Sequence, residues 1–263
     1  MRTLRNVLLR HLLPRGTIEL LKRCGGDGVT RKEYITELLQ TYDLVRALSR
    51  READDEVLLL CHKTQGRQLV VRSYRTPVVA YEQLKCLKHP HVPEVFDSLT
   101  FPDGQVVLEE YISGTALSDV LEKTTFSYRN ARRLMCEIGS ALMTLHAMSV
   151  VHRDVKPENV LITDDGRAVL LDLNASRVHC SEKSNDTTVL GTIGYAPPEQ
   201  FGISQSDATA DVYALGVLLN VLLTGCHPSE RLARGRAGKL VLKCTQIDPK
   251  HRFPSVEKLL ENL

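Results

Sequence analysis

The stretch VHRDVKPENVLI, residues 151–162, contains the polar residues around which the rest of this chain can be interpreted. It places Asp154, Lys156 and Asn159 on one short loop, and a second carboxylate, Asp172, follows an apolar run shortly downstream. Two carboxylates, an ammonium group and an amide are suited to holding a nucleoside triphosphate and its Mg²⁺. The stretch is therefore a candidate site of phosphoryl transfer, whose catalysis depends mainly on positioning and charge neutralisation.

A long helix is predicted to lead into this loop. Residues 128–148 place apolar side chains on one helical face, at Ala131, Leu134, Ile138, Leu142 and Leu145. Within the loop, Pro157 favours an extended backbone at Lys156, because the proline ring crowds the residue before it. The ammonium group of Lys156 is therefore expected to have a fixed direction.

A β-hairpin is predicted to follow the loop. Residues 160–162 and 168–171 are apolar, and the turn between them contains Asp165-Gly166, a strong hairpin signal. Pairing of these two runs would return Asp172 to the neighbourhood of Asn159. The four polar groups are thus expected to form one site.

Shorter, alternating patterns precede the long helix and predict a small β-rich region. The strand candidates are residues 44–48, 56–61, 68–74, 94–99 and 105–110. A short helix carrying Tyr81, Leu84 and Leu87 is expected between the third and fourth strands, and Pro102-Asp103-Gly104 is a turn signal between the last two.

The first 40 residues are predicted to be a helical extension. Residues 1–13 combine leucines at helical spacing with arginines on other faces, which fits either contact with an anionic membrane or partner, or a helix that caps the following domain. Thr30 and Glu33 have the spacing of a capping box that opens a helix through Gln40.

The composition is that of an ordinary globular protein. The formal net charge of +2 over 263 residues gives no reason to expect a nucleic acid partner. The seven cysteines are scattered without a CxxC pair, as expected for thiols in a reducing compartment. No apolar run approaches the roughly 20 residues that a membrane span requires. These features predict a cytoplasmic protein.

Several motifs in a fixed order resemble those of the protein kinase superfamily. They are HRDxKPxN from His152, the acid at Asp172, GTIGYAPPE at residues 191–199, DVYALG from Asp211, and Arg252. The sequence of residues 191–200 is similar to the corresponding segment of bacterial kinases of the eukaryotic-like Ser/Thr type. The resemblance implies an α+β, bilobal fold: a helical extension (1–40), a small β-rich N-lobe (41–112) and a larger, mainly helical C-lobe (113–263).

The resemblance also implies catalytic roles. Asp154 would accept the proton of the substrate hydroxyl, and Lys156 would neutralise charge on the transferring phosphoryl group. Asn159 and Asp172 would hold Mg²⁺, or Mn²⁺ in its place. Thr192 would steady the catalytic loop. A lysine at position 156 favours Ser/Thr rather than tyrosine in the protein substrate.

ATP is the cofactor that the resemblance implies. The residues expected to bind it are Val57, Val70, Arg72, Glu110, Ile112, Lys156 and Leu161. Glu110 and Ile112 belong to the hinge segment, whose backbone would hydrogen-bond adenine. This numbering puts Glu109 at the gatekeeper position, beside the adenine pocket.

The segment from Asp172 to Glu199 resembles a kinase activation segment. Thr187 or Thr188 is expected to become phosphorylated by the chain itself and to pair with Arg153. A polar loop that simply contains hydroxyl groups is the other interpretation. The resemblance further implies a buried ion pair between Glu199 and Arg252, and an anchoring role for Asp211.

The N-lobe departs from the family pattern. The three positions of the glycine-rich loop fall on Arg50, Glu52 and Asp55, although a close approach to phosphate normally requires glycine. Arg72 stands where the strand-three lysine is expected, and arginine is not equivalent to lysine. Glu82 would pair with Arg72 or remain an exposed acid.

The magnesium motif reads Asp172-Leu173-Asn174, with asparagine where glycine is usual. Asparagine is one of the few residues that tolerate a left-handed backbone.

Three functions are compatible with these features. The first is a Ser/Thr protein kinase that transfers the γ-phosphate of ATP to protein hydroxyls, for which all four catalytic groups are present. The second is a pseudokinase-like, nucleotide-binding regulator or scaffold, suggested by the missing glycines. The third is a small-molecule phosphotransferase, against which the peptide-binding type of segment at residues 191–199 argues.

Overall fold

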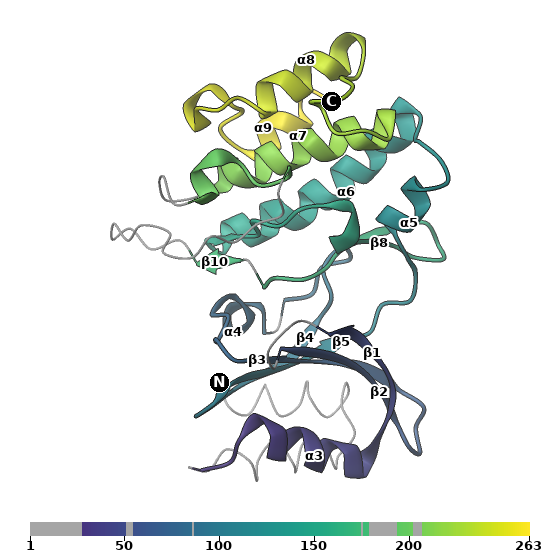
Figure 1. Ribbon diagram of the computed structural model, residues 1–263, viewed down its shortest axis with the longest axis vertical. Helices are drawn as coiled ribbons and strands as arrows, with labels where there is room; N and C mark the ends of the chain where they lie inside the picture. The colour runs from purple at the N-terminus through teal and green to yellow at the C-terminus, as the bar shows by residue number, and fades with distance from the viewer. Residues whose placement is uncertain (1–27, 51–54, 86, 175, 179–193, 202–206) are drawn as a thin grey trace. The chain divides into compact units, whose positions relative to one another are not determined.

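The computed structural model describes residues 28–50, 55–85, 87–174, 176–178, 194–201 and 207–263. These form two compact units (Figure 1). The strand unit comprises the described residues up to Lys88 together with Pro93–Tyr111, and the helical unit comprises His89–Val92 and Ile112–Leu263. The helix expected at residues 1–13 lies outside the described ranges.

The strand unit is built on one antiparallel sheet in which all five predicted strands are present. The strands are β1 (Tyr42–Arg50), β2 (Glu56–His62), β3 (Gln68–Tyr74), β4 (Val95–Phe101) and β5 (Gly104–Glu110), in the order β1-β2-β3-β5-β4. Gly104 closes the hairpin between β4 and β5 with φ 141°. A Cβ at this position would meet the carbonyl oxygen of Tyr74 at 2.0 Å, so only glycine fits there.

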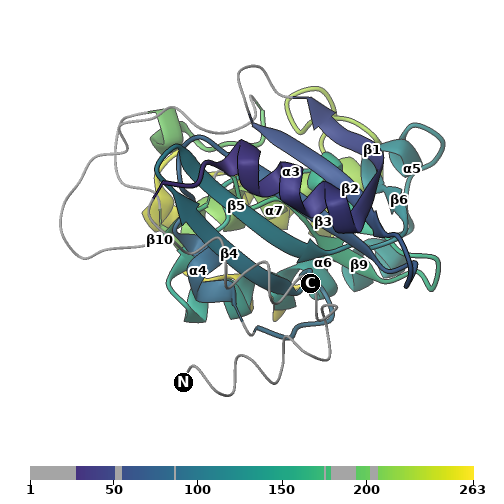
Figure 2. The ribbon, with the colours of Figure 1, turned by 90° about the horizontal axis from the view of Figure 1, so that it is seen from below.

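Helix α3 (Arg31–Thr41) covers one face of this sheet (Figure 2). It begins with the predicted capping box: Thr30 accepts from the backbone N–H of Glu33, and the Glu33 carboxylate accepts from the N–H of Thr30. Tyr34 and Leu38 are fully buried against the sheet. The sheet side chains of this core are Leu58, Leu60, Leu69, Val71, Val106 and Leu108.

Alternation along the strands sends the intervening residues to the opposite face. Val57 on β2 pairs directly with Arg72 on β3, and Leu59 pairs with Val70. The expected ATP-contacting residues of β2 and β3 therefore share the face that α3 does not cover.

Helix α4 (Ala80–Leu84) is shorter than the sequence indicates, and its expected extension to Leu87 is wrong. Lys85 leaves the helical conformation with ψ 124° and forms a bridge with Val95. The N–H of Leu87 instead closes a turn on the carbonyl of Leu84. Competition from the neighbouring strand thus ends the helix after five residues.

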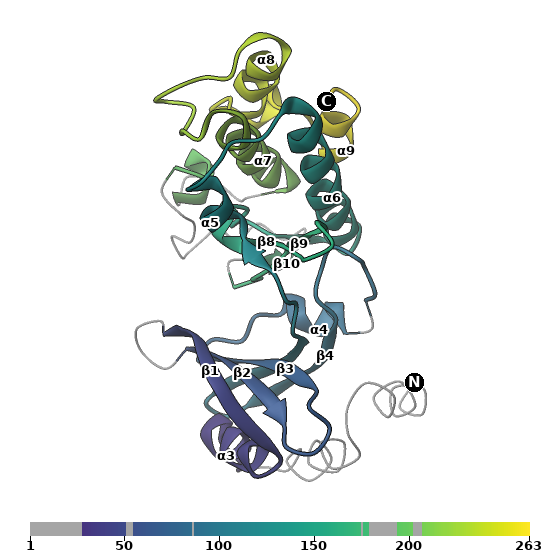
Figure 3. The same cartoon turned by 90° about the vertical axis from the view of Figure 1, so that its right-hand side faces the viewer.

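The helical unit contains the helices α5 (Leu117–Leu121), α6 (Tyr128–Ala147), α7 (Ala208–Thr224), α8 (Gly235–Cys244) and α9 (Val256–Leu260). Figure 3 shows α6, α7, α8 and α9 gathered on one side of its short strands. The predicted inner face of α6 is buried at all five positions. Helix α7 is buried almost all round, so it forms the centre of this unit.

Short strands and 3₁₀ turns complete the helical unit. The strands are β6 (Thr115–Ala116), β7 (Val150–Val151), β8 (Val160–Ile162), β9 (Ala168–Leu170) and β10 (Arg177–Val178), and the turns are η1 (Pro157–Asn159), η2 (Pro198–Phe201) and η3 (Pro249–His251). β8 and β9 form the predicted hairpin. No helix within the described ranges is long and apolar enough to cross a membrane.

Leu38→Ala should destabilise the protein by about 2–5 kcal/mol, because it opens a cavity between α3 and the sheet. The exposed Gln40→Ala on the same helix should change stability by less than about 0.5 kcal/mol. Urea unfolding followed by circular dichroism measures both. Equal, small effects would show that α3 is not part of the core.

Candidate active site

The loop after β7 is held by a single buried carboxylate, that of Asp211 on α7. Its Oδ2 accepts the backbone N–H of His152 at 2.9 Å, and its Oδ1 accepts that of Arg153 at 2.8 Å. Arg153 has φ 68°, a left-handed backbone that is unfavourable for a long side chain. The two hydrogen bonds from one fully buried carboxylate offset this strain and fix the start of the loop.

The environment of Asp211 keeps this carboxylate charged. Burial alone would raise its pKa, but a hydrogen bond from His146, the charges of His146 and His152, and the N–H of Arg153 hold the pKa below the ordinary value of 3.8. His146 Nε2 lies 2.7 Å from Oδ2. The anchoring of Asp211 was expected from the motif resemblance, whereas the part played by His146 was not. Its place in the last turn of α6 was the only available signal.

Asp154, Lys156 and Asn159 contact one another at the end of this loop. Lys156 Nζ lies 2.8 Å from Asp154 Oδ2, and Asn159 Nδ2 donates to the same oxygen at 2.8 Å. Asn159 also donates to the backbone carbonyl of Asp154. Lys156 is extended, with φ −154° and ψ 164°, as Pro157 predicts.

The hairpin places Asp172 next to the same loop. The N–H of Leu171 donates to the carbonyl of Asn159 at 2.8 Å, and His152 Nε2 lies 3.1 Å from the carbonyl of Leu171. Asp172 itself adopts φ 64°. The sequence suggested a left-handed backbone at Asn174. The left-handed residue of this motif is instead Asp172. A hydrogen bond from the N–H of Asn174 to Asp172 Oδ1 supports this conformation.

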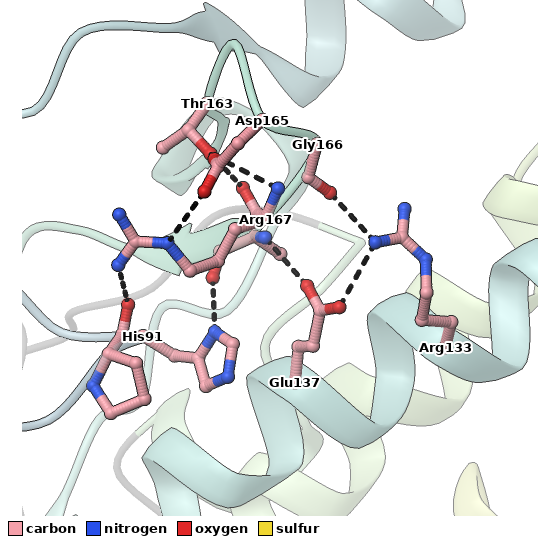
Figure 4. Close-up of polar contacts among 9 residues, drawn as sticks. His91, Arg133, Glu137, Thr163, Asp165, Gly166 and Arg167 are labelled. Atoms are coloured by element: carbon pink, nitrogen blue, oxygen red, sulfur yellow. Dashed lines mark hydrogen bonds and ion pairs between the residues drawn. The ribbon is translucent and has the colours of Figure 1, made fainter.

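A network of polar contacts braces the hairpin against α6 (Figure 4). Glu137 accepts from the N–H of Ala168 at 2.7 Å, and Arg133 donates to the carbonyl of Gly166 and to Glu137. His91 Nδ1 lies 2.7 Å from the carbonyl of Ala168. None of these partners was identified from the sequence, because their spacing follows no motif. They hold β9, the strand that shortly precedes Asp172.

A divalent metal ion fits the donors present. Mg²⁺ is usually bound by one or two protein oxygens together with phosphates and water. Asp172 supplies a carboxylate, and the Oδ1 of Asn159 is not used by the hydrogen bonds of its amide nitrogen. No group of three or more His, Cys, Asp or Glu suited to a metal occurs within the described residues. Asn159 and Asp172 would supply two of the oxygen ligands of such a metal.

The expected ATP-binding residues of the strand unit lie on the sheet. Val57 and Val70 are buried on the face opposite α3. Arg72 is also buried there, and its Nε lies 2.6 Å from Glu109 Oε2. The suggested pairing of Arg72 with Glu82 is not found among the described contacts, because Glu82 pairs with Lys85 at 2.7 Å on its own short helix.

The remaining ATP-binding candidates are distributed along the chain. Glu110 ends β5, and its N–H donates to the carbonyl of Glu94 at 2.9 Å, so a contact with adenine would use its carbonyl. Ile112 is half-buried, as is Leu161 on β8. Of the glycine-loop positions, Asp55 accepts from the N–H of Arg75, and Glu52 lies outside the described ranges.

The predicted ion pair between Glu199 and Arg252 is present and completely satisfied. Arg252 donates to both carboxylate oxygens, at 2.5 and 2.9 Å, and to the carbonyls of Thr209, Gln246 and Ile247. All five guanidinium donors are thereby used. Gln200, next to Glu199, donates to the carbonyl of Arg153 at 3.0 Å. The segment at η2 is thus tied to the catalytic loop, a link that the sequence did not reveal.

Three expected site residues of the activation segment lie outside the described ranges: Thr187, Thr188 and Thr192. Arg153, the expected partner of a phosphorylated threonine, is buried.

Comparison with known proteins shows the same family. Residues 72–262 match the family model of the protein kinase domain. The chain is 30% identical to a probable serine/threonine-protein kinase of Clostridium perfringens over 65% of this chain and 25% of the relative. It is 31% identical to the serine/threonine-protein kinase PknL of Mycobacterium tuberculosis over 70% and 43%, respectively. For PknH of Mycobacterium bovis the identity is 39%, over 54% and 24%. The chain thus spans less than half the length of each of these relatives.

Asp211→Asn should destabilise the protein at neutral pH by about 1.5–3 kcal/mol, since an amide nitrogen would face an N–H donor. Because the folded-state pKa of Asp211 is lowered, its contribution is present above the unfolded value near 3.8 and is lost as the pH falls further. Urea unfolding at a series of pH values should therefore show a flatter acid limb for the variant.

The exposed Asp119→Asn provides the control, with a change below about 0.5 kcal/mol at neutral pH. An acid limb of unchanged steepness in Asp211→Asn would contradict the assignment of Asp211 as a charged anchor.

Proposed function

This chain belongs to the protein kinase superfamily, and on that premise we propose that it is a Ser/Thr protein kinase that transfers the γ-phosphate of ATP to protein hydroxyls. The observation that carries the proposal is the mutual contact of Asp154, Lys156 and Asn159 on a loop anchored by Asp211. The hairpin adds Asp172 through the backbone bond between Leu171 and Asn159. A nucleotide-binding scaffold would not require this complete set of catalytic groups.

Each group has a distinct task in this proposal. Asp154 accepts the proton of the attacking hydroxyl and orients its oxygen. Lys156 pairs with Asp154 in the structure and neutralises charge on the transferring phosphoryl group. This charge grows in the transition state, close to the donors of the helical unit. Asn159 and Asp172 hold Mg²⁺, which neutralises phosphate charge when bound. Thr192 steadies the catalytic loop.

The nucleotide side of the proposal rests on the strand unit. Arg72 supplies a buried cation, and Val57 and Val70 supply the apolar surface beside it. Loss of the glycine loop should weaken ATP binding more than it slows transfer, because transition-state charge lies at the γ-phosphate. The pseudokinase alternative would follow if ATP were bound without being used.

Asp154→Asn should lower the rate of phosphate transfer by on the order of 10²–10⁴-fold while leaving Mg·ATP binding intact. The measurement uses γ-labelled ATP with a generic basic protein as acceptor. Asp164→Asn, an exposed residue of the hairpin turn, is the control and should retain full activity. A wild-type chain that binds ATP but transfers no label would establish the pseudokinase alternative instead.

Self-phosphorylation at Thr187 or Thr188 is part of the same proposal, with Arg153 as the partner of the phosphate. Replacing both threonines by alanine should remove most of the label that the chain incorporates into itself, whereas Ser184→Ala should not. Mass spectrometry that locates the phosphate on other residues would refute this assignment. Contact of residues 1–13 with a membrane or a partner, and a cytoplasmic location, complete the proposal.

A further inference from the structure

The loop between α7 and α8, residues 225–234, is held by a fully buried amide on α7. The Nδ2 of Asn220 donates to the carbonyls of Cys226 at 2.9 Å and Arg231 at 2.8 Å. Its Oδ1 accepts the backbone N–H of Ala233 at 2.8 Å. One side chain thus uses its donors and its acceptor to fix the backbone at both ends of the loop.

His227 on this loop contacts the backbone of a segment that is distant in sequence. Its Nε2 lies 2.9 Å from the carbonyl oxygen of Gly194. Because a carbonyl accepts and does not donate, Nε2 carries the hydrogen. Nδ1 is then the acceptor of the neutral ring, and it receives the N–H of Ser229 at 3.2 Å, with Ser229 Oγ 2.7 Å away. Both ring nitrogens are therefore engaged, which fixes the orientation of the imidazole.

Gly194 has a backbone that suits this contact. Its φ of 97° lies in the region that side chains rarely adopt, whereas a Cβ would make only ordinary contacts with the His227 ring, at 3.7 Å. The backbone conformation, and not a lack of space, therefore requires glycine here. The bond from His227 holds the carbonyl of this turn in place.

The stretch that Gly194 opens, residues 194–200, lies beside the catalytic loop. At its end, Gln200 donates to the carbonyl of Arg153 at 3.0 Å. Burial, together with the negative charge of Glu158 in the catalytic loop, raises the pKa of Tyr195 to about 12. The stretch is thus fixed to the catalytic loop at one end and to the α7–α8 loop at the other.

Folding alone does not account for the contact between His227 and Gly194. Both residues are only half-buried, so water can replace the hydrogen bond at little cost to the stability of the folded state. The contact instead determines where the backbone of residues 194–200 lies relative to Asp154. An acceptor hydroxyl has to reach Asp154 along this side of the catalytic loop.

We propose that His227 is a positioning residue for the acceptor protein: by holding the carbonyl of Gly194, it keeps residues 194–200 in the place where the acceptor segment binds beside Asp154. The inference rests on the proposed function, since the acceptor is the protein substrate of that activity. It concerns the binding of the acceptor, and neither the binding of ATP nor the transfer step.

Two amide variants separate the two nitrogens of the ring. In His227→Gln the amide nitrogen replaces Nε2 and can still donate to Gly194, whereas the shorter side chain of His227→Asn replaces only Nδ1. With myelin basic protein as acceptor, His227→Asn should raise the KM for the acceptor by about tenfold or more. Its kcat and its KM for ATP should change by less than about twofold. His227→Gln should stay within about threefold of the wild-type KM for the acceptor.

His251→Asn is the matched control, because His251 is an exposed histidine of the same unit. It should leave all three constants unchanged. An unchanged acceptor KM in His227→Asn, an equal rise in His227→Gln, or a parallel rise in the KM for ATP would overturn the inference.

Hydrogen–deuterium exchange separates positioning from unfolding. In His227→Asn the amides of residues 194–196 should exchange faster, while those of α7 should keep their wild-type rates. Faster exchange throughout α7 would show that His227 acts on the stability of the whole unit, which contradicts a positioning role.

The proposed activity is decided by a different outcome. Isothermal titration calorimetry gives the Kd for myelin basic protein without any transfer of phosphate. A wild-type chain that binds this protein and Mg·ATP but transfers no phosphate would refute the kinase proposal, while the Kd values of His227→Asn and His227→Gln would still decide the role of His227. A wild-type chain that does not bind the acceptor would refute the inference.

Discussion

The carboxylate of Asp211 is the point on which the candidate site depends. It accepts the N–H groups of His152 and Arg153, and so maintains a left-handed backbone at Arg153 that the residue would not adopt alone. Asp211 can do this because α7 is buried almost all round and because His146 supplies a further hydrogen bond. From this anchor the loop continues to Asp154, Lys156 and Asn159 with little remaining freedom. Asp172 is then added by a hairpin whose own contacts reach α6.

The two units contribute differently to the proposed activity. The helical unit retains every group expected for phosphoryl transfer, with short contacts among Asp154, Lys156 and Asn159. The strand unit lacks the glycines of the usual phosphate-binding loop, and its cation is an arginine paired with Glu109 across the sheet. The strand unit is therefore the part of the chain that departs most from the motifs of its family.

Local signals allowed much of this structure to be predicted. The capping box at Thr30, the buried face of α6 and the hairpin turn at Asp165-Gly166 depend on residues close in sequence, and all three are present. The pairing of Arg72 with Glu109 could not be predicted, because it requires the register between β3 and β5, and 37 residues separate the partners. The hydrogen bond from His146 to Asp211 could not be predicted for the same reason, since its partners are also far apart in the sequence. The predicted end of α4 was wrong because Lys85 forms a bridge with the neighbouring strand. Helical periodicity in the sequence does not reveal such a tertiary contact.

The hydrogen bonds of Asp211 to His152 and Arg153 hold the loop of Asp154 in the chain without nucleotide. Hydrogen–deuterium exchange of residues 150–162 in the nucleotide-free protein tests this claim most directly. Protection of the His152 and Arg153 amides comparable to that of α7, and lost in Asp211→Asn, is the predicted result. Exchange at the rate of an unstructured chain, with protection appearing only after Mg·ATP is added, would contradict it.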